Sequence, residues 1–231
     1  MSVTNIGVLN LYRSSIGKKV IMAVTGLIGI GYVIMHMYGN LKVFDGAEHF
    51  NAYAEGLREL GAPIFGYSHL LWIARLVLLV AVVLHVWAAW SLYRESEKAR
   101  STKYVKHVKL QANPAALYIR VGGVMLLLFI ILHLMHLTWG VPGVHPDFEA
   151  GNVYHNVVLG FQSYLPTLFY LVAMVALGFH MYHGTWSLFQ TLGLNNQNYT
   201  LPLRLVSLIL AIVVAGGFAL VPLAVMFGII S

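Results

Sequence analysis

The chain contains no cysteine. That absence excludes disulfides, thiolate-ligated iron–sulfur clusters and haem attached covalently through a Cys-x-x-Cys-His motif. Charged side chains are also scarce, since Asp, Glu, Lys and Arg make up 10% of the 231 residues, whereas soluble domains carry about 25%. The composition therefore excludes a soluble domain, and any prosthetic group must be held by coordination and packing.

Apolar residues dominate the chain: 59% of the residues are hydrophobic, and the mean hydropathy is +0.76. Five apolar runs are long enough to cross a bilayer, and helices are the spanning element that such runs favour. We predict spans at about residues 20–38, 70–92, 118–139, 166–189 and 203–229. The predicted fold is an all-α integral membrane protein, a five-helix transmembrane bundle that forms a single domain over residues 1–231.

The cations predict the orientation in the membrane. Arg13, Lys18 and Lys19 precede the first run, and the loop at residues 140–165 contains no Lys or Arg. Between spans two and three lie six further cations: Arg94, Lys98, Arg100, Lys103, Lys106 and Lys109. The positive-inside rule then puts the N-terminus in the cytoplasm and the C-terminus outside, in a multi-pass protein of the cytoplasmic membrane.

The net charge of +6 does not indicate nucleic acid as a partner. The cations lie beside the spans, where membrane topology and a partner surface explain them better. In the loop after span one, residues 47–60 are predicted to form a short amphipathic helix at the outer surface.

Histidines recur inside four of the five runs, at His36, at His85, at the pair His133 and His136, and at the pair His180 and His183. An ionisable side chain at membrane depth costs roughly 2.5 kcal/mol or more unless it is compensated. With a helical rise of about 1.5 Å per residue, spans one and three carry their histidines near the outer end. Spans two and four carry theirs about 10 Å from the inner end.

Two histidines at one depth on different helices can bind the iron of a planar macrocycle from both faces. Such an iron is six-coordinate and suits electron transfer, because no position stays open for a substrate. Pairing span one with three and span two with four predicts two non-covalent b haems, one at each level. The alternatives are interhelical hydrogen bonds, a zinc or copper site, and the proton relay of a transporter. A single metal site is disfavoured because the histidines lie at two levels.

Four strings in the chain carry a family resemblance: SSIGKK at residues 14–19, MAVTGL at 22–27, HMYGNL at 36–41 and HGTWSLFQTLG at 183–193. They resemble the cytochrome b membrane-anchor subunit of succinate dehydrogenase and fumarate reductase. The form resembled is the single-chain, five-span, di-haem anchor that serves menaquinone. The resemblance covers nearly the whole chain.

Carried over by position, the resemblance implies His36 and His133 as ligands of the outer haem, and His85 and His183 as ligands of the inner haem. It favours His183 over His180, and His133 over His136. His136 then becomes a group that supports a ligand, contacts the haem propionates or lies on the quinone side.

Three charged residues near the outer end complete the candidate site. The resemblance implies an acid near the outer haem at the quinone site, and the loop after span one supplies Glu55 and Glu59. The alternative is that both acids lie on a solvated face of that loop. Arg75, near the outer end of span two, is a candidate to neutralise haem propionates, and the alternative is that it extends to the membrane interface.

The resemblance also implies a function, that of the anchor of a succinate:menaquinone oxidoreductase, the respiratory complex II of the tricarboxylic acid cycle. A flavoprotein subunit oxidises succinate, an iron–sulfur subunit relays the electrons, and this chain passes them through two haems to menaquinone. Residues 14–19 and 94–109 are the expected docking surface for the iron–sulfur subunit. The alternative is the haem b subunit of another quinone-linked enzyme, such as a formate dehydrogenase or a hydrogenase.

Overall fold

The computed structural model describes residues 12–99 and 114–231, with side chains from residue 119 onward in the second range. These residues form helices and no strands. Of the predicted docking surface, residues 100–109 with Arg100, Lys103, Lys106 and Lys109 lie outside the described residues.

In the described part of the chain, five helices are long and apolar enough to cross a membrane. They are α2 (Ser15–Leu41), α4 (His69–Lys98), α5 (Pro114–Leu137), α7 (Tyr164–Thr191) and α8 (Thr200–Met226). Each overlaps one of the five predicted spans, so the prediction of an all-helical, multi-pass membrane protein is confirmed. The orientation of the two termini stays a prediction.

Helix α2 begins five residues before the predicted span, because its start is set by a cap. The Ser14 side chain accepts a hydrogen bond of 3.0 Å from the Gly17 backbone N–H, which satisfies one of the free donors at a helix start. In the first turn, Lys18 forms an ion pair with Glu95 of α4. Ser15 also donates to Glu95, at 3.2 Å. The first turn of α2 is therefore joined to the last part of α4.

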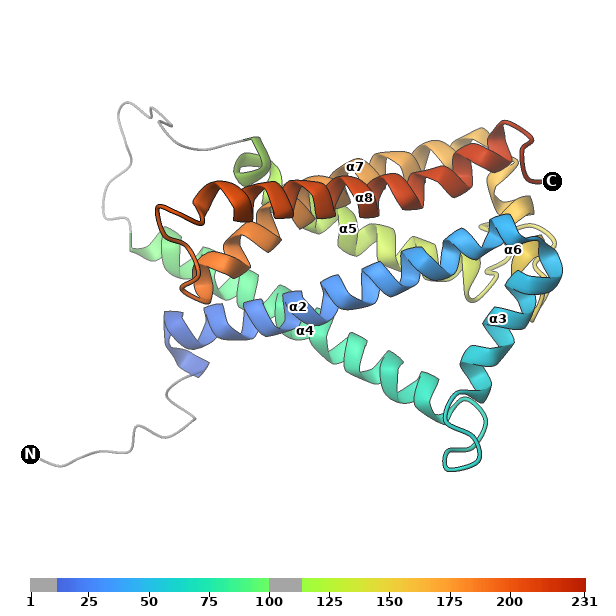
Figure 1. Cartoon of the computed structure of the whole chain (residues 1–231), viewed down its shortest axis with the longest axis horizontal. Helices are drawn as coiled ribbons and strands as arrows, with labels where there is room; N and C mark the ends of the chain where they lie inside the picture. The colour runs from blue at the N-terminus through green and yellow to red at the C-terminus, as the bar shows by residue number, and fades with distance from the viewer. Residues whose placement is uncertain (1–11, 100–113) are drawn as a thin grey trace, which may run out of the picture.

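Two short helices cover one end of the bundle. Helix α3 (Ala47–Glu59) follows the turn η1 (Lys42–Asp45) and confirms the amphipathic helix predicted at residues 47–60. Helix α6 (Val153–Phe161) was not predicted, since its nine residues are too few to form a span. Both lie at the end where α2 ends and where the C-terminus lies (Figure 1). We call this end the α3–α6 end; it is the end predicted to face outside.

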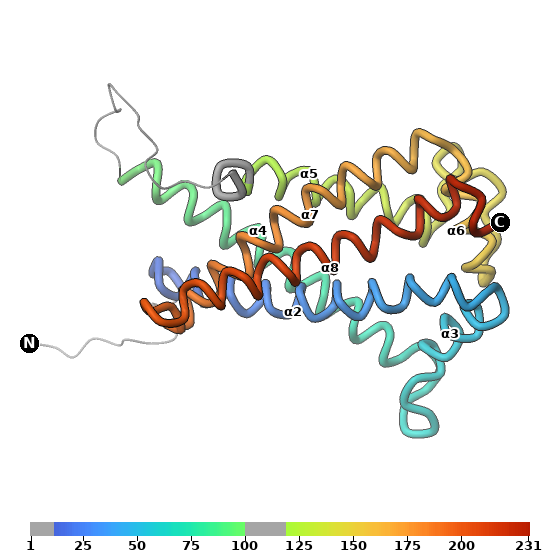
Figure 2. Tube along the Cα trace, turned by 45° about the horizontal axis from the view of Figure 1, so that its top comes forward, coloured from blue at the N-terminus to red at the C-terminus, as the bar shows by residue number. Residues whose placement is uncertain are grey.

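Helices α7 and α8 form the centre of the bundle. Buried residues make up 33% of the apolar window of α7 and 39% of that of α8, but 6% of the window in each of the other three spans. Helices α7 and α8 run side by side, α2 packs against α4 and α8, and α5 packs against α7 (Figures 1 and 2). The apolar outer surfaces of α2, α4 and α5 suit contact with lipid.

Candidate functional site

The outer pair consists of His36 on α2 and His133 on α5. Their ring centroids lie 5.8 Å apart, with the ring planes at 82°. Helices α2 and α5 carry these residues near the ends that meet at the α3–α6 end of the bundle (Figure 1). The structure thus brings together the two histidines that were predicted at the outer level.

Aromatic rings surround the outer pair. The Tyr32 ring stacks on His36 at a centroid distance of 5.3 Å, and Phe218 of α8 lies 5.7 Å from the same imidazole. On the other side, Phe129 lies 5.6 Å from His133. These contacts fix the ring positions from three helices.

Tyr170 of α7 connects His133 with His136. Its hydroxyl lies 3.2 Å from His133 Nδ1 and 3.0 Å from His136 Nδ1. A phenol has one proton, so Tyr170 donates to one imidazole and accepts from the other. The protein thereby occupies the Nδ1 atom of His133, and Nε2 is the nitrogen left for a metal. A tyrosine inside an apolar run carries no mark of this role in the sequence.

The inner pair consists of His85 on α4 and His180 on α7, with ring centroids 6.2 Å apart and planes at 56°. The Thr25 hydroxyl lies 3.1 Å from His85 Nδ1 and donates to the Ile21 carbonyl at 2.7 Å. Since that donation uses the only hydroxyl proton, Thr25 accepts from His85 Nδ1. His85 Nε2 is then the nitrogen left for a metal, as at His133.

His180 lies in apolar surroundings. Its Nδ1 atom is buried and has no hydrogen-bond partner among the described residues. The ring borders a cavity of about 300 Å³ between α5 and α7, and it is the one polar side chain among the described residues that line it. The cavity is lined by Ile119, Val121, Gly122, Met125, Val172, Val175, Ala176, Phe179 and His180.

His183, which the resemblance favours, lies three residues after His180 on α7. Among the described residues, no ring contact joins His183 to His85, whereas His180 faces it. A glycine lies against each ring of the inner pair. A Cβ atom on Gly26 would be 3.6 Å from His85 Cε1, and one on Gly123 would be 3.7 Å from His180 Cε1. The structure thus brings His180, rather than His183, against His85.

The separation of the rings fits two imidazoles on one metal ion. Metal–imidazole nitrogen bonds of about 2 Å on opposite sides of an ion put the two ring centroids about 6 Å apart. The outer pair is at 5.8 Å and the inner pair at 6.2 Å. In each pair the centroid separation is therefore close to that of two imidazoles on opposite sides of one ion.

His136 lies beside the outer pair and is 4% exposed. Its Nδ1 contacts Tyr170, and its ring centroid lies 5.0 Å from that of His145. His145, in the connection between α5 and α6, was not predicted as part of the site. It is a loop histidine in the sequence, and α6 is what buries it.

Arg75 lies on α4 with its guanidinium over the Trp72 ring, 4.9 Å from the centroid. This position is compatible with both predicted roles of Arg75, which are an anion partner and an interfacial cation.

Glu55 of α3 is bound by its neighbours. Its carboxylate accepts hydrogen bonds from the Tyr67 hydroxyl at 2.6 Å and from Arg58 at 2.7 Å. These two contacts hold the pKa of the Glu55 carboxyl below its ordinary value. Glu59, at the end of α3, is exposed. Among the described residues, the side-chain hydrogen bonds of Glu55 run to Tyr67 and Arg58 and not to a histidine.

The described part of the predicted docking surface lies at the opposite end of the bundle. Lys18 is paired with Glu95, and Lys98 lies in the last turn of α4. Arg94 and Lys98 are exposed. Arg94 and Lys98 thus lie at the surface of this end, and the docking of a partner there stays a prediction.

Comparison of the chain with protein-family models, with curated proteins and with solved structures finds no match. The membership in a family that the four sequence strings predict stays a prediction.

Proposed function

We propose that the chain is the membrane anchor and electron-transfer subunit of a succinate:menaquinone oxidoreductase that carries two non-covalent b haems. The observation that carries the proposal is the presence of two histidine pairs, each made by two helices and each at its own level. The four sequence strings support the choice of this enzyme over another quinone-linked enzyme.

In this proposal His36 and His133 hold the outer haem, and His85 holds the inner haem. For the fourth ligand, the resemblance favours His183 and the ring contact favours His180. We choose His180, because its ring is the one on α7 that faces His85.

Bound haem supplies reversible one-electron chemistry at its iron. The parts of the chain have separate tasks around it. The four histidines would hold the two haems and would leave no metal position open to substrate. Tyr170 and Thr25 orient two of the imidazoles by hydrogen bonds to Nδ1. Arg75 neutralises propionate charge at the outer level.

The remaining predictions form part of the same proposal. The N-terminus lies in the cytoplasm, and residues 14–19 and 94–109 contact the iron–sulfur subunit, which receives electrons from the flavoprotein. Menaquinone is reduced at the α3–α6 end. Of its candidate residues, His136 is buried beside the outer pair, whereas Glu55 and Glu59 lie on α3.

Purification of the chain with its native partners tests the proposal. The expected result is a flavoprotein and an iron–sulfur subunit in the complex, succinate dehydrogenase activity, and the reduced-minus-oxidised optical band of b haem. The same band with formate dehydrogenase or hydrogenase activity would favour the alternative enzyme. A complex without the band would contradict both.

A further inference from the structure

The connection between α3 and α4 exposes apolar side chains at the α3–α6 end of the bundle. We call residues 60–67 the apolar loop. No Lys, Arg, Asp or Glu occurs between Glu59 and Arg75. Within the loop, Ile64 is 86% exposed, and the other large side chains that are exposed are Leu60, Phe65 and Tyr67. An exposed apolar segment of this kind marks contact with a membrane or with another protein.

The position of the apolar loop favours the membrane. The loop stands out to one side of the bundle, where it joins α3 to the start of α4, and it lies away from α7 and α8 (Figures 1 and 2). Along the length of the bundle, it does not extend past the ends of α2 and α8. Because α2 and α8 are membrane spans, the loop lies beside the spans and not beyond them in the solution.

The surface of α4 continues the apolar loop along the bundle. Trp72 and Ile73, near the start of α4, are exposed, and so are Leu76 and Val77 one turn further on. Tryptophan is enriched at the boundary between lipid and water. Because α4 is one of the spans, lipid covers the helical part of this surface, and the apolar loop adjoins it directly.

Much of the backbone of the apolar loop is hydrogen-bonded within the segment, as contact with lipid requires. Three backbone N–H groups donate to nearby carbonyl oxygens: Ala62 to Glu59 at 3.1 Å, Phe65 to Gly61 at 2.9 Å, and Ser68 to Arg58 at 2.6 Å. Pro63 has no N–H group to satisfy. The loop is therefore a closed turn whose entry into lipid exposes few free backbone donors.

The polar groups at the base of the apolar loop are bonded to α3. The Tyr67 hydroxyl donates to the Glu55 carboxylate at 2.6 Å, and Arg58 donates to the same carboxylate at 2.7 Å. A tyrosine with an exposed ring and a hydrogen-bonded hydroxyl suits a membrane interface, where one end is apolar and the other is wet. The charges beside the loop are thus paired, and its apolar side chains remain exposed.

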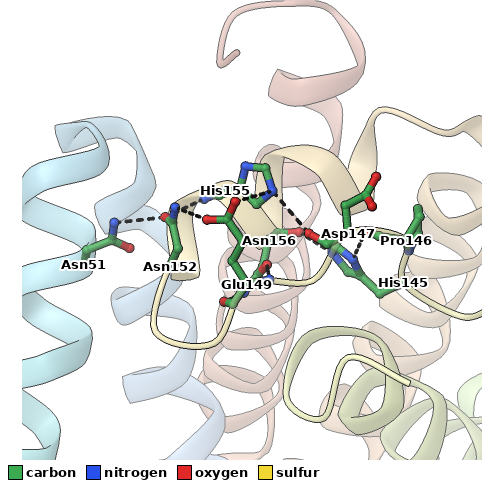
Figure 3. A network of polar contacts seen from close by, with 8 residues as sticks. All are labelled: Asn51, His145, Pro146, Asp147, Glu149, Asn152, His155 and Asn156. Carbon is green, nitrogen blue, oxygen red and sulfur yellow. Dashed lines mark hydrogen bonds and ion pairs between the residues drawn. The ribbon is translucent and has the colours of Figure 1, made fainter. Parts of the chain in front are cut away.

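The connection between α5 and α6, at the same end of the bundle, has the opposite character. It carries the acids Asp147 and Glu149, and its polar side chains bond to one another, to α6 and to α3 (Figure 3). The Glu149 carboxylate accepts from Asn152 at 2.8 Å, and Asn51 of α3 donates to Asn152 at 3.1 Å. Such polar side chains suit contact with water, so the two connections at this end suit different surroundings.

We propose that the apolar loop lies in the lipid bilayer, with Leu60, Ile64 and Phe65 among the lipid chains of the leaflet on the side of the α3–α6 end. Tyr67 lies at the boundary, with its hydroxyl on Glu55. The partner of this surface is lipid and not a second protein. The inference needs the membrane spans alone, and it holds whichever enzyme the chain serves.

Spin labelling tests the proposal, because the chain has no cysteine and one substitution supplies a single thiol. The full-length Ile64→Cys variant is labelled with a nitroxide and placed in phosphatidylcholine bilayers. Electron paramagnetic resonance then measures how often the label collides with oxygen, which concentrates in lipid, and with a water-soluble nickel chelate. The expected ratio of oxygen to nickel collisions is several-fold higher at residue 64 than at residue 149 in Glu149→Cys.

Two matched references define lipid and water. The Leu76 side chain on α4 is 58% exposed, and the Glu149 side chain is 56% exposed. The label at residue 64 should behave like the label in Leu76→Cys and unlike the label in Glu149→Cys. Leu60→Cys provides a second position in the apolar loop if Ile64→Cys does not assemble.

A collision ratio in the apolar loop equal to that at residue 149 would overturn the proposal, because the loop would then lie in water. A label that neither oxygen nor nickel reaches would also overturn it, since a second copy or another protein would then cover the loop. Neither result depends on haem or on quinone, so the outcome is separate from that of the proposed function.

Discussion

The two histidine levels of the bundle differ in what surrounds them. At the outer level, one tyrosine hydroxyl joins His133 to His136, and His136 packs on His145. At the inner level, the one side chain among the described residues that hydrogen-bonds a histidine of the pair is Thr25, at His85 Nδ1. His180 there borders a cavity without another polar side chain among its lining residues.

This difference separates two tasks in the proposed function. Electron transfer between haems needs no proton donor, so an apolar inner level is sufficient. Quinone reduction consumes protons, so polar groups that reach the solution are needed where the quinone reacts. The polar network at the α3–α6 end and its absence around His180 agree with that division.

The largest expected effect tests the inner level. His180→Ala should remove one of the two haems, because it deletes the imidazole that faces His85. His183→Ala is the matched variant, one turn away on α7, and should keep both haems. Haem content per chain and redox titration of each variant measure the result. Loss of a haem in His183→Ala but not in His180→Ala would support the ligand implied by the resemblance.

The second effect tests the outer level. Tyr170→Phe removes the hydroxyl that His133 and His136 share, and it leaves two imidazole nitrogens without this partner. We expect the variant to lose about 1–3 kcal/mol of stability and to keep the outer haem, since the iron contacts are untouched. Thermal unfolding in detergent and the haem spectrum measure both quantities. The control is Tyr154→Phe, whose exposed hydroxyl donates to the Ser231 carbonyl; an equal loss there would contradict the prediction.

A smaller effect is expected from the corresponding change at the inner level. Thr25→Val keeps the side-chain shape but removes the hydroxyl that contacts His85 Nδ1. The variant loses the hydrogen bond with His85 and the one that the hydroxyl donates to the Ile21 carbonyl, and each neutral hydrogen bond is worth about 0.5–1.5 kcal/mol of stability. Thr191→Val is the control, since the exposed Thr191 hydroxyl also donates to a carbonyl of its own helix but contacts no histidine. If Thr25→Val loses no more stability than Thr191→Val, the contact with His85 does not stabilise the fold, and the prediction is wrong.

The sequence predicted the elements that depend on apolar length. All five spans are found, because a run of about 20 apolar residues has few other stable structures. The early start of α2 depends on the Ser14 cap, and α6 depends on burial under the end of the bundle. Neither effect is visible in an average of hydropathy over a long window.

Only part of the candidate site could be predicted from the sequence, because residue counting gives the depth of a side chain but not the direction in which it points. Depth along a helix follows from counting residues, and it brought His36 opposite His133. The rotation of a helix about its axis does not follow from depth, so His180 and His183, one turn apart, were not separated by it. The contacts of Tyr170 and His145 join segments that are remote in the chain, and no local pattern marks them.

The smallest expected effect concerns Glu55, the acid that the resemblance offers for the quinone site. Tyr67 and Arg58 hold the pKa of its carboxyl below the ordinary value of 4.5. A lowered pKa in the fold means that the ionised carboxylate stabilises the fold above that ordinary value. The contribution is lost as the pH falls through the lower, folded value.

Glu55→Gln should therefore lower the unfolding temperature slightly at neutral pH, and the difference from the wild type should shrink as the solution is acidified. Thermal unfolding over a pH series measures it, with the exposed Glu59→Gln as the control. Reduction of menadione by the complex, with succinate as reductant, should fall less in Glu55→Gln than in His136→Gln, because Glu55 is bound to Tyr67 and Arg58 whereas His136 lies beside the outer pair. A larger loss of menadione reduction in Glu55→Gln than in His136→Gln would indicate that Glu55 of α3, and not His136, donates protons at the outer level.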